Sequence, residues 1–239
     1  YLLCNEDVTN HIPHMQAYIR GDWELVQDYM MIKIVPKEGE LKAEPRGFGC
    51  KTAQDRARSI VQEVNTAGYL HKYSDEHAMT LTEIELARKL LAFRSMADAY
   101  PGYKALIVNV DSSAWNNGFR SLAVRPVMAA TLDRIYGMPL WSKTMEGFEH
   151  SFVYIPDHKR VYWWDGQQGG IEGLNQYTWV LTYIHQMKVC MAKHNYPYYI
   201  LCKGDDLRIV VLVPPSVLET KTINALRLEI METLSVEGA

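Results

Sequence analysis

Two adjacent aspartates interrupt an otherwise apolar stretch near the C-terminal end of the sequence. Residues 199–212 read YILCKGDDLRIVVL, with Gly204 directly before Asp205 and Asp206. Short apolar runs rich in Ile, Val and Leu predict two strands, and glycine suits the turn between them. Two ionised carboxylates at such a turn repel each other, so we expect a cation to neutralise them, either Mg²⁺ or Mn²⁺.

The alternative for this tripeptide is an ordinary solvated hairpin turn, because glycine and aspartate are common turn residues. The tripeptide alone favours that alternative. A catalytic interpretation therefore depends on partner residues elsewhere in the chain.

Length and composition fit one large globular domain over residues 1–239. The chain is 48% apolar, which is enough to build a core, and its formal net charge is only −3. Such a weak charge does not by itself indicate a nucleic-acid-binding protein. Because the sequence begins at Tyr1, we expect an excerpt of a longer polypeptide. No apolar run reaches the roughly 18 residues of a membrane span, so none is predicted.

A third carboxylate follows another apolar run. Residues 103–110 predict a buried strand, and Asp111 comes directly after it, where a side chain can face a site. If both strands lie centrally in one sheet, Asp111 and Asp205 come together. The alternative is that Asp111 caps the helix predicted to run to about Tyr136. Carboxylates on two strands that share metal ions are suited to two-metal phosphoryl transfer.

Basic and acidic side chains alternate between Lys37 and Phe48. The cations are Lys37, Lys42 and Arg46, and a strand can hold several of them on one side. A row of cations is what a triphosphate requires. The alternative is an exposed, salt-bridged β-ribbon.

Paired glycines precede a long predicted helix. Gly169 and Gly170 stand in the segment GQQGGIEGLNQ, residues 166–176. We expect their freedom at positive φ to make this loop mobile, with Trp179 as its anchor in the core. The polar side chains that follow the glycines, Glu172, Asn175 and Gln176, can form hydrogen bonds. The alternative is a flexible hairpin exit followed by a core helix.

The remaining periodicity predicts further helices and one more hairpin. Helices at 53–67 and 82–99 are expected to serve packing, the second with a capping box formed by Thr82 and Glu85. A hairpin is predicted at 152–155 and 161–164, and a last helix at 216–234.

Taken together, these segments resemble the RNA-directed RNA polymerases of RNA viruses. In detail they resemble the large polymerase protein of non-segmented negative-strand viruses and of relatives such as chuviruses, over about residues 37–213. The segment from Lys37 to Phe48 is similar to motif F, Asp111 with Trp115, Asn116 and Asn117 to motif A, residues 168–179 to motif B, and residues 204–206 to motif C. The chain departs from the family pattern at Asp206, where Asn is common, and at Gly39 and Asn175, where Arg is usual.

The resemblance implies an α+β fold, namely a right-hand polymerase palm with part of the fingers, in which a small antiparallel sheet packs on helices. It implies RNA-templated RNA synthesis from nucleoside triphosphates, for viral genome replication and transcription. The implied metal ligands and catalytic residues are Asp111, Asp205 and Asp206, and the implied nucleotide-binding residues are Lys37, Lys42, Arg46 and Asn116. The implied contacts with the template or the nascent base pair are Gly169, Gly170, Glu172, Asn175 and Gln176.

The resemblance also implies partners and a location. The partners are an RNA template and product, the remaining domains of the polymerase protein, a phosphoprotein-like cofactor and nucleoprotein-coated RNA. The location is the cytoplasm or nucleus of a host cell, and the virion. Two alternatives stay open: a catalytically silent polymerase-like remnant of an endogenised virus, and a reverse transcriptase. Gly204 before the aspartate pair, and motif B, speak against a reverse transcriptase.

Overall fold

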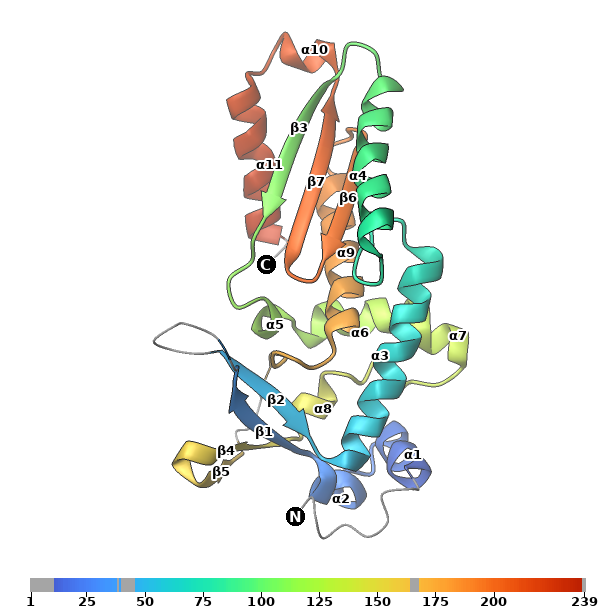
Figure 1. Cartoon of the computed structure of the whole chain (residues 1–239), viewed down its shortest axis with the longest axis vertical. Coiled ribbons are helices and arrows are strands. Elements are labelled where there is room, and N and C mark those ends of the chain that lie inside the picture. Colours follow the sequence, from blue (N-terminus) through green and yellow to red (C-terminus); the bar gives the residue numbers. More distant parts are fainter. Residues whose placement is uncertain (1–10, 38, 40–45, 164–167, 238–239) are drawn as a thin grey trace. The chain divides into compact units, whose positions relative to one another are not determined.

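The computed structural model of the chain describes residues 11–37, 39, 46–163 and 168–237 (Figure 1). These residues form an α+β protein with two small sheets packed on helices. The chain divides into two compact units, and each is described by itself. Unit 1 comprises residues 1–68 and 114–179, and unit 2 comprises residues 69–113 and 180–239.

The sheet of unit 1 has four strands in the order β2-β1-β4-β5. The strands are β1 (Met31–Pro36), β2 (Gly47–Lys51), β4 (Phe152–Ile155) and β5 (Arg160–Tyr162). Strand β1 pairs antiparallel with β2 and parallel with β4, so the sheet is mixed. The predicted hairpin at 152–155 and 161–164 is confirmed, except that Trp164 lies outside the described residues.

Most of the other described elements of unit 1 are short helices. They are α1 (Ile12–Arg20), α2 (Trp23–Val26), η1 (Gln27–Tyr29), α5 (Trp115–Gly118), α6 (Ser121–Met128), η2 (Ala129–Asp133), α7 (Arg134–Tyr136), α8 (Glu146–Glu149) and η3 (Pro156–His158). Helices α6, η2 and α7 follow one another directly and confirm the helix predicted to end near Tyr136; η2 is π-helical. The core of unit 1 contains large aromatic side chains that are almost fully buried, among them Trp141, Phe148 and Trp179.

The long helix α3 (Ala53–Tyr73) spans the division between the units and extends further than the predicted 53–67. Helix α9 (Gln176–Ala192) spans it as well. None of the described helices is long and apolar enough to cross a membrane.

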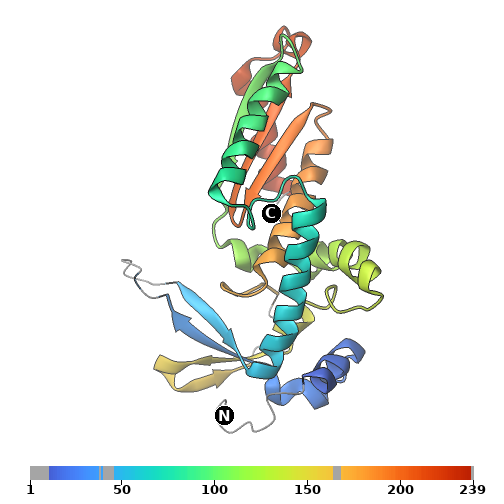
Figure 2. The ribbon, with the colours of Figure 1, turned by 45° about the vertical axis from the view of Figure 1, so that its right-hand side comes forward.

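The sheet of unit 2 is antiparallel, with the order β3-β7-β6. Its strands are β3 (Lys104–Val110), β6 (Tyr198–Lys203) and β7 (Asp206–Val213). Helix α4 (Glu83–Asp98) lies over one face of this sheet, and α9 and α11 (Ile223–Glu237) lie over the other (Figures 1 and 2). The strand-turn-strand at Gly204 and the small antiparallel sheet on helices are confirmed.

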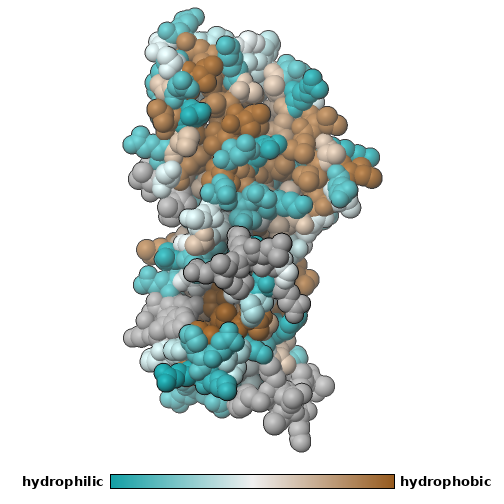
Figure 3. Space-filling model, turned by 60° about the vertical axis from the view of Figure 1, so that its left-hand side comes forward, coloured by the Kyte–Doolittle hydropathy of each residue, from teal (hydrophilic) through white to brown (hydrophobic). Residues whose placement is uncertain are grey.

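Three predictions about unit 2 need correction. Strand β3 is an edge strand, with Val108 as its only buried residue, because an apolar run predicts a strand but not how many neighbours it has. Helix α4 has the predicted capping box but buries none of its residues, and Ile84 is 67% exposed. The predicted last helix is two helices, α10 (Pro215–Leu218) and α11. In the view of Figure 3, apolar surface gathers on unit 2, in keeping with these exposed side chains.

Candidate active site

One end of the antiparallel sheet in unit 2 carries the predicted carboxylates. The last pairs of its two ladders are Val110 with Leu207 and Lys203 with Asp206. Asp111 follows β3 directly, and Gly204, at φ +70°, forms the turn to β7 with Asp205. All three aspartates are exposed, and Asp111 and Asp206 line one cleft of about 480 Å³. The register therefore brings Asp111 to the same end of the sheet as the aspartate pair.

The carboxylates at this end of the sheet raise the pKa of two side chains near them. Burial raises the pKa of the Tyr183 hydroxyl, its hydrogen bond with the Ser112 hydroxyl (2.9 Å) opposes the shift, and Asp111 and Asp205 both add to it. Burial also raises the pKa of the Cys202 thiol to about 12, with further contributions from Asp205 and Asp206. Asp111 and Asp205 are thus both within electrostatic range of one buried hydroxyl group.

The structure does not support Asp111 as a helix cap. The N-cap residue of α5 is Ala114 and that of α6 is Arg120, and neither helix start has a side-chain cap. The carboxylate of Asp111 is therefore not engaged in capping either helix that follows it.

Carboxylate oxygens are the ligands that Mg²⁺ prefers, and Mg²⁺ commonly takes one or two protein carboxylates together with water and substrate phosphates. Within the described part of the chain, no group of three or more His, Cys, Asp or Glu side chains is gathered as a metal site. The donors at the end of the sheet therefore fit Mg²⁺ as open carboxylates that substrate would complete, and not as a preformed cage.

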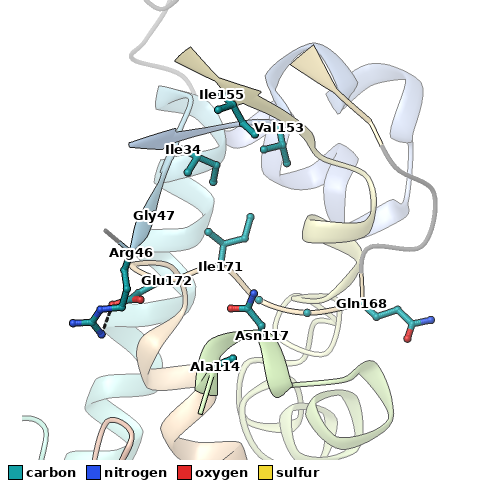
Figure 4. Close-up of a pocket in the computed structure, with 12 residues that line it drawn as sticks. Ile34, Arg46, Gly47, Ala114, Asn117, Val153, Ile155, Gln168, Ile171 and Glu172 are labelled. Atoms are coloured by element: carbon teal, nitrogen blue, oxygen red, sulfur yellow. Dashed lines mark ion pairs between the residues drawn. The ribbon is translucent and has the colours of Figure 1, made fainter. Parts of the chain in front are cut away.

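A second cleft, of about 800 Å³, lies in unit 1 (Figure 4). Its apolar part is made by Ile34 of β1, Val153 and Ile155 of β4, and Ile171. Its polar part contains Arg46 and Glu172, whose Nη1 and Oε1 atoms are 3.1 Å apart. Residues of the motif F segment and of the motif B segment thus line the same cleft.

Two of the predicted motif F cations, Lys37 and Arg46, lie beside the β1–β2 ladder. The N–H of Lys37 donates to the carbonyl of Arg46 (2.9 Å), which extends the ladder by one pair. The ammonium of Lys37 lies 5.5 Å from the centre of the Phe48 ring. Lys42 lies outside the described residues. Two of the three predicted triphosphate ligands are therefore neighbours, and their contact with nucleotide stays a prediction.

The polar residues of motifs A and B contact each other. The side chain of Gln176 donates to the Oδ1 atom of Asn116 (2.9 Å), and the carbonyl of Asn116 accepts from the N–H of Gly170 (3.0 Å). The predicted nucleotide contact of Asn116 and RNA contact of Gln176 remain predictions.

Asn175 departs from its predicted role. It is only 3% exposed, it adopts a left-handed conformation (φ 59°), and its side-chain amide donates to Gln62 (3.4 Å). Asparagine tolerates this conformation at the start of a helix, and here the turn directs its side chain into unit 1. Asn175 is therefore a buried structural residue in this structure and not an exposed contact for RNA.

The sequence of the chain was compared with those of known protein families. Residues 6–235 match the Mononegavirales RNA dependent RNA polymerase family. The chain belongs to this family.

Individual relatives agree with this membership. The chain is 25% identical over 224 residues to RNA-directed RNA polymerase L of infectious hematopoietic necrosis virus (strain WRAC), which covers 82% of this chain and 11% of the relative. It is 27% identical over 211 residues to the same-named protein of Hirame rhabdovirus (77% and 10%) and 28% identical over 202 residues to the large structural protein of Australian bat lyssavirus (76% and 9%). The chain spans about a tenth of the length of these relatives.

In this member of the family, the paired glycines of motif B serve close packing. Neither Gly169 nor Gly170 has a positive φ, in contrast to Gly173 (φ +86°). A Cβ atom on Gly169 would lie 2.5 Å from the carbonyl oxygen of Asn117, and one on Gly170 would lie 2.5 Å from the Trp179 ring. In this structure the glycines do not use their freedom at positive φ, and they are needed because the backbone of α5 and the Trp179 ring leave no room for a side chain. The mobility expected of this loop stays a prediction.

The sequence did not indicate that Glu63 holds the start of the motif B helix. Its carboxylate accepts from the N–H groups of Tyr177 (2.9 Å) and Thr178 (3.3 Å) in the first turn of α9. Burial raises the pKa of Glu63, and these hydrogen bonds oppose the shift. A carboxylate from a distant helix satisfies the free N–H groups of a helix start, and no local sequence signal announces such a partner.

Gly170→Ala is expected to lower the free energy of unfolding by about 1–3 kcal/mol, the usual cost of overpacking. The new methyl group meets the Trp179 ring and the carbonyl oxygen of Asn116, 2.8 Å away. Trp179 cannot yield easily, because it is fully buried and stacks on Phe119. Urea unfolding at neutral pH measures the effect.

Gly68→Ala is the matched control for this variant. Gly68 lies within α3, and a Cβ atom there meets no atom within 4 Å, so alanine is expected to stabilise by about 0.5–1 kcal/mol. If Gly170→Ala proved as stable as the unmodified protein, the segment would leave Trp179 readily, and the mobile loop would be favoured over the packed one.

Proposed function

We propose that this chain forms the catalytic core of an RNA-directed RNA polymerase that adds nucleotides to an RNA 3′-hydroxyl on an RNA template. The observation that carries the proposal is the antiparallel ladder, which brings Asp111 to the same end of the sheet as Asp205 and Asp206, in a chain of the Mononegavirales polymerase family. In this proposal the sheet of unit 2 is the centre of a polymerase palm, and the ribbon of unit 1 belongs to the fingers.

Asp111 and Asp205 are the residues that would hold Mg²⁺, with Asp206 as a third carboxylate beside them. When bound, a pair of such ions lowers the pKa of the attacking hydroxyl group and neutralises charge on the phosphates. The chain itself supplies open, exposed carboxylates at the end of a sheet whose central strand β7 is buried over most of its length. The hydrogen bond between Ser112 and Tyr183 fixes the backbone directly after Asp111.

Arg46 and Lys37 would bind the triphosphate. The guanidinium of Arg46 offers a planar set of donors to phosphate oxygens, and the Lys37 ammonium adds a point charge next to it. An RNA template and product and nucleoside triphosphates are the proposed ligands. The remaining domains of a longer polymerase protein, a phosphoprotein-like cofactor and nucleoprotein-coated RNA are the proposed partners, in a host cell and in the virion.

Arg46→Ala is expected to raise the nucleotide concentration required for half-maximal RNA-templated incorporation by about tenfold, since a charged hydrogen bond to phosphate is worth about 1.5–3 kcal/mol. The measurement is incorporation by the full-length protein on a defined RNA template over a range of nucleotide concentrations. Arg160→Ala, at an exposed position of β5 in the same sheet, is the matched control and is expected to leave that concentration unchanged.

Two outcomes would contradict this proposal at different levels. If Arg46→Ala left the nucleotide dependence unchanged, the ribbon would be only a charged surface. If the unmodified protein showed no template-dependent incorporation under any condition with Mg²⁺ or Mn²⁺, the catalytically silent alternative would replace the polymerase.

A further inference from the structure

Arg46 forms an ion pair with a carboxylate of the motif B segment. Its guanidinium lies 3.1 Å from Glu172, at one side of the unit 1 cleft (Figure 4). The Arg46 side chain is 45% exposed and that of Glu172 22% exposed. The pair is thus open to ligands in solution, and it involves the cation to which we assign the triphosphate.

Glu172 is held in place independently of this ion pair. Its carbonyl accepts from the N–H of Gly49 on β2 (3.0 Å). The next residue, Gly173, packs so closely on the Phe48 ring that a Cβ atom there would lie 2.4 Å from it. The backbone around Glu172 is therefore docked along the strand that follows Arg46, which keeps the Glu172 carboxylate within reach of the guanidinium.

We propose that Glu172 is an internal counter-anion that occupies Arg46 until a triphosphate displaces it, so that Glu172 lowers the triphosphate affinity of the site. The inference rests on the proposed function, which assigns Arg46 to the triphosphate. A guanidinium neutralised by a fixed carboxylate offers fewer donors and less positive charge to a phosphate. A triphosphate must then break the ion pair between Arg46 and Glu172 before it can bind Arg46. The apparent affinity for the triphosphate falls, as it does when only a fraction of a protein is in the binding-competent state.

Such a counter-anion also suits the end of the catalytic cycle. Binding substrate and transition state equally tightly does not accelerate the chemical step, and a tightly held pyrophosphate would slow product release. Because Glu172 stays docked beside Arg46, it can take the guanidinium back when pyrophosphate leaves. Glu172 is thus a residue that sets affinity, and it is distinct from the template contact expected of it from the sequence.

The test measures binding of tripolyphosphate to the full-length protein by calorimetry, without RNA. Glu172→Gln, which removes the charge but keeps the shape, is expected to bind tripolyphosphate about two- to fivefold more tightly than the unmodified protein, the range for a half-exposed ion pair. In an Arg46→Ala background the same substitution is expected to have no effect. Glu24→Gln, at an exposed position of α2 in unit 1, is the matched control for a general change of charge.

The variants separate failure of this inference from failure of the proposed function. If Arg46→Ala does not weaken tripolyphosphate binding, Arg46 is not a phosphate ligand and the proposed function loses that part. If Arg46→Ala weakens binding but Glu172→Gln leaves it unchanged or weakens it, Glu172 only positions Arg46, and the counter-anion is overturned. Glu172→Asp, which keeps the charge on a shorter side chain, guards against misfolding of the glutamine variant and is expected to give a smaller gain.

Discussion

Asp205→Ala is expected to lower RNA-templated nucleotide addition by at least about 10²- to 10³-fold, the scale of losing one electrostatic stabiliser of a transition state. The fold should persist, because Asp205 is exposed in the turn between β6 and β7. Removing one of two adjacent carboxylates relieves repulsion when no cation is bound, so the melting temperature should stay level or rise. Primer extension beside thermal melting on the full-length protein gives both quantities.

Asp98→Ala is the matched control for this variant. Asp98 is an exposed carboxylate of unit 2 at the end of α4, away from motifs A and C in the sequence, and its loss is expected to leave extension unchanged. Undiminished extension by Asp205→Ala would favour the solvated hairpin turn as the role of motif C. Loss of the folded state would instead mean that Asp205 serves the structure of the turn.

The hairpin around Gly204 was predictable because all of its determinants are local. A short apolar run, a glycine and a second apolar run rich in Ile, Val and Leu specify strand, turn and strand, and the structure has the strands at 198–203 and 206–213. The position of β3 was not predictable in the same way. Its run of Leu, Ile and Val resembles a buried strand, yet β3 pairs only with β7 and leaves Ile107 58% exposed.

The other differences between the sequence-based predictions and the structure concern residues whose contacts lie far away in the sequence. The sequence marks the paired glycines of motif B as unusual. The structure shows that a side chain at either position would collide with the backbone of Asn116 or Asn117 or with the Trp179 ring. Asn175 is expected from the sequence to contact the template or the nascent base pair, whereas its side chain is buried against Gln62 of α3. Such packing depends on contacts far apart in sequence, which periodicity and spacing do not encode.

A buried ionic cluster in unit 1 is the largest feature that the sequence did not reveal. The predicted helix at 53–67 suggested apolar packing, but its first turns carry Asp55 and Arg58, each about 1% exposed. The carboxylate of Asp55 lies 2.5 Å from Arg58, 2.9 Å from Lys51 and 3.4 Å from His14. One buried carboxylate therefore contacts two cations and one histidine.

The surroundings of this cluster are built to hold charge away from water. Arg58 stacks over the Tyr18 ring at 4.0 Å and donates to Gln62 (2.9 Å). Lys51 donates to the Ser59 hydroxyl (3.0 Å). Each side-chain nitrogen atom of Arg58 and Lys51 thus has a hydrogen-bond partner, as buried ions require.

The pH dependence of the cluster has a defined sign. Burial acts to raise the pKa of Asp55, but Arg58, Lys51 and the hydrogen bond from His14 outweigh it and hold the pKa well below its ordinary value of 3.8. A carboxylate with a lowered pKa in the folded state contributes stability that is complete above the unfolded pKa and is lost as the pH falls through the folded one. The contribution of Asp55 is therefore complete at neutral pH and declines only below about pH 4.

Asp55→Asn is accordingly expected to lower the free energy of unfolding at pH 7 by about 3–5 kcal/mol, the cost of breaking a buried ion pair by removing one partner. Asparagine keeps the shape and one acceptor, but it leaves the charges of Lys51 and Arg58 without a counter-ion in a dry site. Denaturant unfolding from pH 3 to pH 7 is the measurement, with Asp157→Asn, at an exposed position of η3, as the matched control. The difference between Asp55→Asn and the unmodified protein should shrink as the pH falls below 4, because protonation of Asp55 in the unfolded state then stabilises the unfolded chain of the unmodified protein. A difference below about 1 kcal/mol at pH 7, the size expected for an exposed pair, would mean that water reaches the cluster and that its charges are not truly buried.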